Sequence, residues 1–315
     1  MSSSRTVVLD TDPGIDDAMA LLYLHACDNL ELLGITTILG NASIENCTNN
    51  ALFLCEQFGI FAPVYRGADR GVTGEQPENY PDFVHGMNGL ADIKVKVAGK
   101  SAEDQDACTY LLESSNANPG EITIIAVGRL TNIALALNKD PTFANRVKEI
   151  IFMGGAANCE GNVTVWAEAN IIGDPEAASI VFNSSIPLVM VGLDVTLLTR
   201  MSHSFLDSLT SDLAPLQSLL LSINKVYANF YKTSQNWDEF PVHDSSAIAY
   251  AHNPKIFSTE QGQLTCILDG EQRGRTVFVP STSGNHRVCL SVDSNALLDD
   301  YFKNVTAAYR QTTNH

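Results

Sequence analysis

Short, continuous apolar runs alternate along the first two thirds of the chain with stretches whose apolar residues recur at helical spacing. The runs are rich in β-branched residues and too short for helices, which indicates buried parallel strands. The expected strands are Val7–Leu9, Leu32–Ile38, Ile122–Val127, Ile150–Met153 and Leu188–Gly192. The expected helices are Asp16–Ala26, Ile44–Phe58, Thr131–Leu137 and Pro175–Asn183. Alternating strands and helices predict an α/β protein, with an open, mostly parallel, Rossmann-like sheet flanked by helices.

Two of these helices carry a start signal. Asp174 precedes Pro175, the arrangement expected when aspartate caps a helix and proline takes its first position. Thr131 is predicted to cap its own helix in the same way. Ligands of such sheets bind at the carboxyl ends of the strands, so we expect functional side chains there.

The pattern changes in the last third of the chain. We expect a mostly helical region at Ser202–Lys232 and a closing helix at Asn295–Tyr309. Between them, Leu264–Leu268 and Arg275–Pro280 are expected to form a β-hairpin around Asp269-Gly270-Glu271. Two polar stretches, Asp69–Phe83 and Thr233–Val242, have the length of lids or binding loops. Because no linker, repeat or low-complexity segment interrupts the chain, we expect one domain over residues 1–315.

Composition narrows the choice of partners. The 315 residues are 45% hydrophobic and carry a formal net charge of -17, with a pI near 4.6. Such an acidic chain disfavours nucleic acid and anionic membranes as partners and suits a small neutral or cationic ligand. No apolar run reaches the roughly 18 residues of a membrane helix, and Met1–Arg5 has no signal-peptide pattern. Seven cysteines without CxxC spacing predict reduced thiols and a cytoplasmic protein.

Four aspartates crowd the end of the first strand. Asp10 and Asp12 are two positions apart, and Asp16 and Asp17 follow a Pro-Gly turn in the first helical turn. The helix dipole favours each of the latter two by only about 0.3–1 kcal/mol, which does not offset four like charges. A bound cation would, and acidic oxygens without thiols or paired histidines favour Ca²⁺ or Mg²⁺ over Zn²⁺. The alternative is that Asp16 and Asp17 cap the helix while Asp10 and Asp12 are solvated.

Two further polar groups stand out. His243-Asp244 precedes a helix, and Glu168 and Asn170 lie near Asn162. Clustered carboxylates and amides suit the hydroxyl groups of a sugar. The alternatives are a satisfied surface histidine and an ordinary polar loop.

With these residues in view, the chain resembles the inosine-uridine-preferring nucleoside hydrolases, which are calcium-dependent ribonucleoside N-ribohydrolases. The resemblance covers nearly the whole chain. Its motifs, in order, are Asp10-Thr-Asp12-Pro-Gly-Ile-Asp-Asp17, Thr36-Thr-Ile-Leu-Gly-Asn41, Val84-His-Gly86, Gly128-Arg-Leu-Thr-Asn132, Phe152-Met-Gly-Gly155, Ala167-Glu-Ala-Asn-Ile171, Asp174-Pro-Glu-Ala-Ala178, Gly192-Leu-Asp-Val-Thr196 and Val242-His-Asp244. Each motif alone is modest, but the full ordered set is highly specific.

The resemblance implies the nucleoside hydrolase fold and hydrolysis of a ribonucleoside to ribose and free base, in salvage or catabolism. It implies that Asp12 is the catalytic base and that Asp12, Asp17 and Asp244 ligate Ca²⁺ together with the backbone carbonyl of Val127. Asp10 matches an aspartate that supports the ligands without binding the ion. Relatives form dimers and tetramers, so a homodimer or homotetramer is expected.

The resemblance also implies a substrate pocket. The positions that match ribose contacts are Asp16, Asn41, Met153, Asn162, Glu168 and Asn170. The positions that match base-side residues are His85, His243, Tyr227 and Tyr231, and Trp237 in the second loop is a candidate to cover the base. The departing base needs a proton, and histidine is its natural donor, so His243 is the expected acid. Ala169 departs from the aromatic residue that some members carry there.

Two rival functions remain open on the sequence. An aspartate-nucleophile phosphatase uses DxDx[TV], which Asp10-Thr-Asp12-Pro-Gly14 matches in part, although glycine takes the fifth position and the following aspartate pair has no role. A calcium-dependent sugar-binding module would use the same acidic residues without turnover. Ribose release separates the hydrolase from both.

Overall fold

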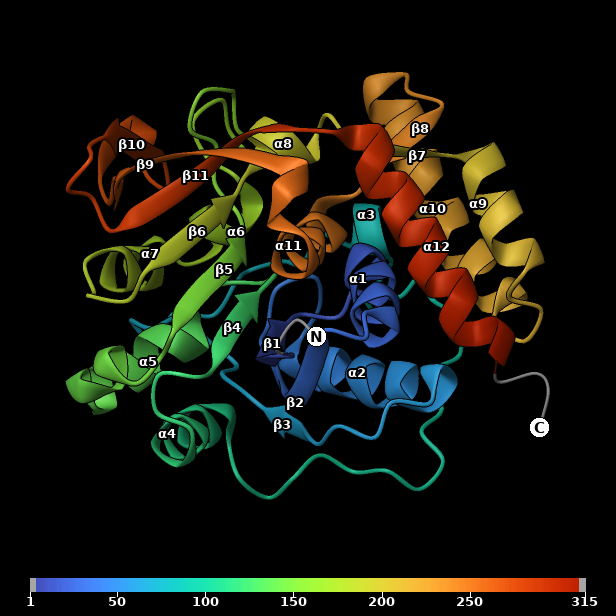
Figure 1. Ribbon diagram of the computed structural model, residues 1–315, viewed down its shortest axis with the longest axis horizontal. Helices are drawn as coiled ribbons and strands as arrows, with labels where there is room; N and C mark the ends of the chain where they lie inside the picture. Colours follow the sequence, from blue (N-terminus) through green and yellow to red (C-terminus); the bar gives the residue numbers. More distant parts are fainter. Residues whose placement is uncertain (1–3, 312–315) are drawn as a thin grey trace.

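The computed structural model describes residues 4–311. Residues 1–3 and 312–315 lie outside the described residues. Both ends of the predicted domain 1–315, and most of the segment Met1–Arg5, therefore lie outside them as well. The centre is a nine-stranded sheet with the order β10-β9-β11-β6-β5-β4-β1-β2-β3 (Figure 1). Its strands are β1 (Arg5–Thr11), β2 (Leu30–Thr37), β3 (Val64–Arg66), β4 (Thr123–Ala126), β5 (Glu149–Met153), β6 (Leu188–Val191), β9 (Phe257–Cys266), β10 (Thr276–Pro280) and β11 (His286–Val292).

The sheet is mostly parallel, as predicted. Only β9 pairs antiparallel with its two neighbours, β10 and β11. A separate two-stranded antiparallel sheet joins β7 (Arg200–Ser202) to β8 (Glu239–Pro241). Among residues 4–311, no helix combines the length and the apolar character needed to cross a membrane.

Helices cover both faces of the central sheet (Figure 1). Those whose side chains join the core of one face are α1 (Ile15–Ala26), α2 (Ile44–Phe58), α9 (His203–Ser211), α10 (Gln217–Gln235), α11 (His243–His252) and α12 (Ser294–Gln311). Those of the other face are α4 (Ala107–Ala117), α5 (Thr131–Lys139) and α7 (Pro175–Phe182). Three short helices, α3 (Asp82–His85), α6 (Ala169–Gly173) and α8 (Leu193–Thr196), lie in the connections between longer elements.

The strand residues alternate between the two cores. Val7 and Leu9 of β1 belong to the core under α1, whereas Val8 belongs to the core under α4 and α5. All three are buried. This explains why the strands read as continuous apolar runs: successive side chains point to opposite faces, and helices cover both.

The structure corrects several boundaries. Thr131 does not cap α5: Leu130 takes the cap position and Thr131 is the first helical residue. The region Ser202–Lys232 is mostly helical, as predicted, and it divides into two helices, α9 and α10. The polar stretch Thr233–Val242 holds the end of α10 and all of β8. The hairpin exists as β9 and β10, but β3, α4 and β11 have no counterpart in the sequence prediction because their patterns are short or weakly periodic.

Asp174 caps α7 as predicted and also ties three segments together. Its carboxylate accepts hydrogen bonds from the backbone N–H of Ala177 at 3.1 Å, the backbone N–H of Val72 at 2.8 Å and the hydroxyl of Thr131 at 2.7 Å. Asp174 is buried. One carboxylate therefore holds the start of α5, the start of α7 and the polar loop that leads to α3.

Replacing Asp174 with alanine should lower the free energy of unfolding by about 2–4 kcal/mol, because the cap is lost and two further donors lose their acceptor. Urea unfolding at neutral pH measures the change. Asp106→Ala is the matched control, since Asp106 caps α4 in an exposed position and bonds only within its own helix. Its expected cost is about 1 kcal/mol. Equal losses in the two variants would contradict the role given to Asp174.

Candidate functional site

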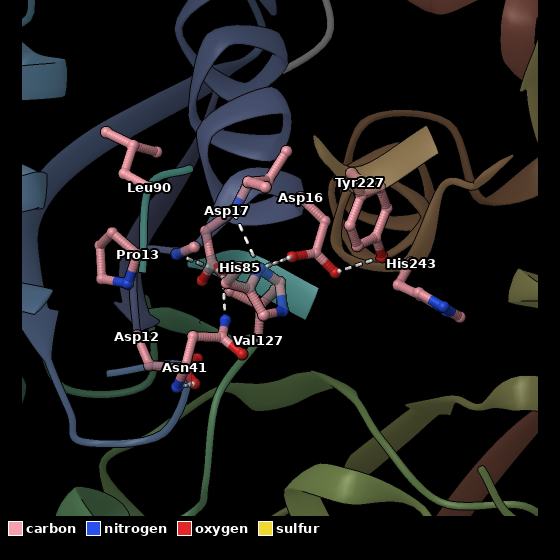
Figure 2. A network of polar contacts seen from close by, with 12 residues as sticks. Asp12, Pro13, Asp16, Asp17, Asn41, His85, Leu90, Val127, Tyr227 and His243 are labelled. Carbon is pink, nitrogen blue, oxygen red and sulfur yellow. Dashed lines mark hydrogen bonds and ion pairs between the residues drawn. The ribbon is translucent and has the colours of Figure 1, made fainter. Parts of the chain in front are cut away.

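Residues far apart in the chain meet at the carboxyl edge of the sheet. Asp12 follows β1, Asn41 lies just beyond β2, Val127 follows β4 and Met153 ends β5. These strands run parallel, so their carboxyl ends lie on one edge, and Figure 2 shows Asp12, Asn41 and Val127 close together there. The parallel topology therefore assembles the predicted site.

Three carboxylates form the centre of the site. One oxygen from each of Asp16, Asp17 and Asp244 lies within 4.8 Å of the others. Asp16 and Asp17 come from the first turn of α1, and Asp244 from the first turn of α11. Asp17 is the best held: it accepts hydrogen bonds from the Thr11 hydroxyl at 2.5 Å, the Gly14 backbone N–H at 2.9 Å and the amide of Asn41 at 2.9 Å.

Asp12 stands beside this group with one oxygen unused. Its Oδ2 accepts a hydrogen bond from the backbone N–H of Asn41 at 2.8 Å, while the buried Oδ1 has no hydrogen-bond partner among residues 4–311. The carboxylate lies between two glycines: an added Cβ would come within 1.9 Å of Oδ2 at Gly40 and 2.5 Å of Oδ1 at Gly128. Only glycine permits this close approach of the backbone.

The electrostatic cost of the arrangement appears in the pKa values. Burial raises the pKa of Asp10, Asp16 and Asp17 to about 6, and at Asp17 the charge of Asp16 adds to it. Burial and neighbouring carboxylates raise the pKa of Asp12 and Asp244 well above the usual range. The site therefore resists carrying its full negative charge unless a cation shares it.

The donor set fits a hard divalent cation. The three-carboxylate group contains only oxygen ligands, and the buried Oδ1 atoms of Asp12 and Asp16 lack hydrogen-bond donors among the described residues. Buried carboxylate oxygens without hydrogen-bond donors are typical ligands of Ca²⁺ or Mg²⁺. Asp17 and Asp244 meet as predicted, and Asp16, predicted as a ribose contact, joins them.

Asp10 lies behind this site. Its Oδ1 accepts hydrogen bonds from the hydroxyl of Thr36 at 2.5 Å and the amide of Asn132 at 2.7 Å. Asn132 also donates to the Thr37 carbonyl and accepts from the Ala68 backbone N–H. This support of the strand ends was missed by the sequence reasoning, although Thr36 and Asn132 both belong to the motifs quoted above.

A second wall is built from amide and carboxylate groups. Glu168 caps α6, and its carboxylate accepts backbone N–H groups of Gly155 at 2.9 Å and Asn170 at 3.0 Å. The Asn170 amide donates to the carbonyls of Val127 at 2.8 Å and Met153 at 3.1 Å. Asn162 is exposed and accepts from the Ala169 backbone N–H at 3.0 Å. Four of the six predicted ribose positions, Met153, Asn162, Glu168 and Asn170, thus lie in this wall, and backbone N–H groups already bind the Glu168 carboxylate.

The opposite wall is aromatic and carries both histidines. The hydroxyl of Tyr227 donates to Asp16 at 3.2 Å, and the hydroxyl of Tyr231 lies 2.9 Å from Nε2 of His243. His85 accepts the Ile15 backbone N–H at 3.3 Å and lies 4.0 Å from Asp16, and Figure 2 shows Asp16 between His85 and Tyr227. Burial lowers the pKa of both histidines to about 4, so both are neutral at pH 7.

Two base-side details differ from expectation. Nδ1 of His243 lies 2.8 Å from the hydroxyl of Thr196, a partner the sequence reasoning did not identify. Trp237, the candidate to cover the base, has two ring contacts that were not predicted: Tyr231 stacks nearly parallel to it, and the guanidinium of Arg200 lies 3.5 Å from the ring centroid.

Comparisons with known proteins agree with this geometry. The family model of the inosine-uridine preferring nucleoside hydrolases matches residues 7–299. A uridine nucleosidase of Arabidopsis thaliana is 38% identical over 279 residues, covering 88% of this chain and 83% of the relative. Two solved structures each have a TM-score of 0.92: the plant nucleoside hydrolase PpNRh1, at 34% identity and covering 96% of this chain and 99% of that one, and a purine-preferring ribonucleoside hydrolase from Gardnerella vaginalis, at 30% identity and covering 98% and 100%.

The raised pKa values predict how Asp16→Asn changes stability in protein freed of divalent cations. The pKa of Asp16 is about 6 in the folded chain, against about 3.9 in an unfolded one, so the wild type loses stability as the pH rises through this window. Asparagine does not titrate. The variant should therefore gain about 1–2 kcal/mol relative to wild type between pH 5 and pH 7.5.

Urea unfolding with a chelator present, at both pH values, measures this difference. A stability difference that stays constant from pH 5 to pH 7.5 would mean that burial does not raise the pKa of Asp16.

Proposed function

This chain belongs to the inosine-uridine preferring nucleoside hydrolase family, and on that premise we propose how its residues perform the reaction. It hydrolyses the N-glycosidic bond of ribonucleosides, which releases ribose and the free nucleobase in salvage or catabolism. An aspartate-nucleophile phosphatase is thereby excluded. Water supplies the hydroxyl that bonds to the anomeric carbon, and the electron pair of the broken C–N bond leaves with the base. One proton leaves the water and one reaches the base.

The observation that carries the assignment is the free oxygen of Asp12. Oδ1 is buried, has no donor among the described residues, and stands beside three further carboxylates. We propose that Asp12 is the catalytic base and takes the proton of the attacking water. The surrounding carboxylates stabilise the positive charge that develops on the ribose ring as the C–N bond breaks.

We propose Ca²⁺ as the metal ion. Its ligands would be the carboxylates of Asp12, Asp17 and Asp244 and the carbonyl of Val127, which retains a lone pair beside its bond from Asn170. All-oxygen ligation favours Ca²⁺ over Zn²⁺. When bound, the ion supplies charge that offsets the crowded carboxylates, orients the ribose diol and lowers the pKa of water.

The two walls then divide the substrate. We propose that the ribose lies against the carboxylate and amide residues Asp16, Asn41, Met153, Asn162, Glu168 and Asn170. The base lies against His85, Tyr227, Tyr231 and His243, with His243 as the proposed proton donor. The proton would come from the imidazolium form of His243. Because burial depresses the pKa of His243, this form is scarce at neutral pH and its proton is readily given up.

Uridine is the substrate we propose to test first, since a uridine nucleosidase is 38% identical to this chain. A structural relative at 30% identity is described as purine-preferring, so inosine belongs in the same panel. We also propose a single catalytic domain over residues 1–315 that assembles as a homodimer or homotetramer. A cytoplasmic location is proposed on the seven cysteines, all unpaired.

Asp12→Asn should abolish ribose release from uridine and inosine while ligand binding persists, because the amide has no proton affinity to serve as a base. Ribose formation with and without chelator measures the reaction, and thermal shift with ribose measures binding. Chelator should inactivate the wild type, and the purified wild type should contain about one calcium per chain.

Three results would count against this assignment: ribose-1-phosphate as product when phosphate is added, zinc in place of calcium, or turnover that survives in Asp12→Asn. If the wild type binds ribose tightly but releases none from any nucleoside, the chain is a sugar-binding module.

His243→Ala tests the proton donor. The variant should lose roughly 10²–10⁴ in the turnover of uridine, the usual contribution of acid catalysis, but keep most of its activity on a nitrophenyl riboside, whose leaving group departs without a proton. Comparing kcat on the two substrates is the measurement. Equal losses on both would show that His243 acts by orienting Asp244.

A further inference from the structure

Tyr231 stands between the imidazole of His243 and the indole of Trp237. Its hydroxyl lies 2.9 Å from Nε2 of His243, and its ring stacks on Trp237 with an angle of 3° between the planes and 5.8 Å between the centroids. Tyr227 and Phe230 meet the same ring edge to face, at 5.1 and 5.0 Å. The indole and these two aromatic rings therefore restrict the position of the Tyr231 ring.

Arg200 also packs against the indole of Trp237. The guanidinium carbon lies 3.5 Å from the ring centroid of Trp237, and Nε donates a hydrogen bond to the carbonyl of Leu197 at 2.9 Å. Leu197 directly follows Thr196, whose hydroxyl lies 2.8 Å from Nδ1 of His243. The contacts form a closed circuit, from Thr196 through His243, Tyr231, Trp237 and Arg200 back to Leu197, the residue after Thr196.

Backbone pairing in the small β7–β8 sheet supports this circuit of contacts. Arg200 pairs with Pro241 across it, and the backbone N–H of Val242 donates to the carbonyl of Thr199 at 3.0 Å. The backbone N–H of Trp237 donates to the carbonyl of Tyr231 at 3.3 Å. Backbone pairing thus places the arginine over the indole and brings His243, two residues after β8, to the tyrosine.

We propose that Arg200 and Trp237 are positioning residues that hold the Tyr231 hydroxyl on His243, so that this pair faces the departing base. The role rests on the proposed function. A phenol on the last turns of a helix can swing, and a hydrogen bond weakens steeply when its angle changes. A cation held over the indole favours the stacked arrangement of the two rings. Trp237 then acts through Tyr231 and needs no contact with the base.

A positioning role predicts a loss that depends on the leaving group. Arg200→Met keeps the length of the stem but removes the cation. Its kcat on uridine should fall about 10- to 100-fold, as misplaced catalytic groups do. Its kcat on a nitrophenyl riboside should fall less than about 3-fold, since that leaving group needs no proton. Arg200→Lys, which retains a cation, should recover most of the uridine activity.

Lys232→Met is the matched control. Lys232 follows Tyr231 and pairs with Asp238, next to Trp237, but both partners are exposed. An exposed pair contributes little, so both substrates should be turned over as in the wild type. A comparable uridine-selective loss in this control would overturn the role of Arg200.

The remaining outcomes are equally decisive. Equal losses on both substrates in Arg200→Met, or no loss on uridine, would overturn the positioning role while the proposed function stands. A wild type that hydrolyses neither substrate would overturn the proposed function, and the positioning role with it. If Arg200→Met does not fold, Trp237→Leu and Trp237→Phe replace it. A loss of activity that is selective for uridine in Trp237→Leu, and smaller in Trp237→Phe, supports the proposal. Any other pattern overturns it.

Discussion

Repulsion between buried carboxylates is the constraint on which this structure depends. Asp12, Asp16, Asp17 and Asp244 are gathered at one edge of the sheet, away from bulk water, and burial raises the pKa of each. No hydrophobic gain at this edge favours such a grouping, since the charged forms are the ones that burial penalises. The cluster is maintained by the fold around it, and a cation bound there would relieve the repulsion. Stability and function are opposed here, as they often are where binding residues are preorganised.

The fold opposes this repulsion with oriented donors. Asp17 alone accepts three hydrogen bonds, from a hydroxyl, a backbone N–H and the amide of Asn41. Asp10 accepts two, and its partner Asn132 also bonds the carbonyl at the end of β2. Each donor favours the charged form of its acceptor. Where donors are missing, at Oδ1 of Asp12 and Oδ1 of Asp16, the site is left open to a cation, a water molecule or a substrate hydroxyl.

The aromatic wall that carries the two histidines follows a different physical rule. Its side chains come from α3, α10 and α11, none of which is a strand of the central sheet. Aromatic rings dominate it, and polar atoms lie at the tips of Tyr227 and Tyr231 and on the rings of His85 and His243. Asp12 is thus placed by the carboxyl edge of the sheet, whereas the aromatic wall is built on helices. The two parts are joined at Asp16, which Tyr227 and His85 both approach.

The sequence by itself determined the mostly parallel sheet and the crowding of aspartates after its first strand, because apolar periodicity and the spacing of aspartates are local. The cap at Asp174 was likewise predicted from two adjacent residues. The sequence did not determine that Thr131 would bond Asp174 instead of capping its own helix, or that Tyr231 and Arg200 would both pack on Trp237. Only the tertiary structure decided these, because Thr131 and Asp174, like Arg200 and Trp237, lie dozens of residues apart. A side chain that has both a local and a distant partner chooses between them by packing, which no local pattern records.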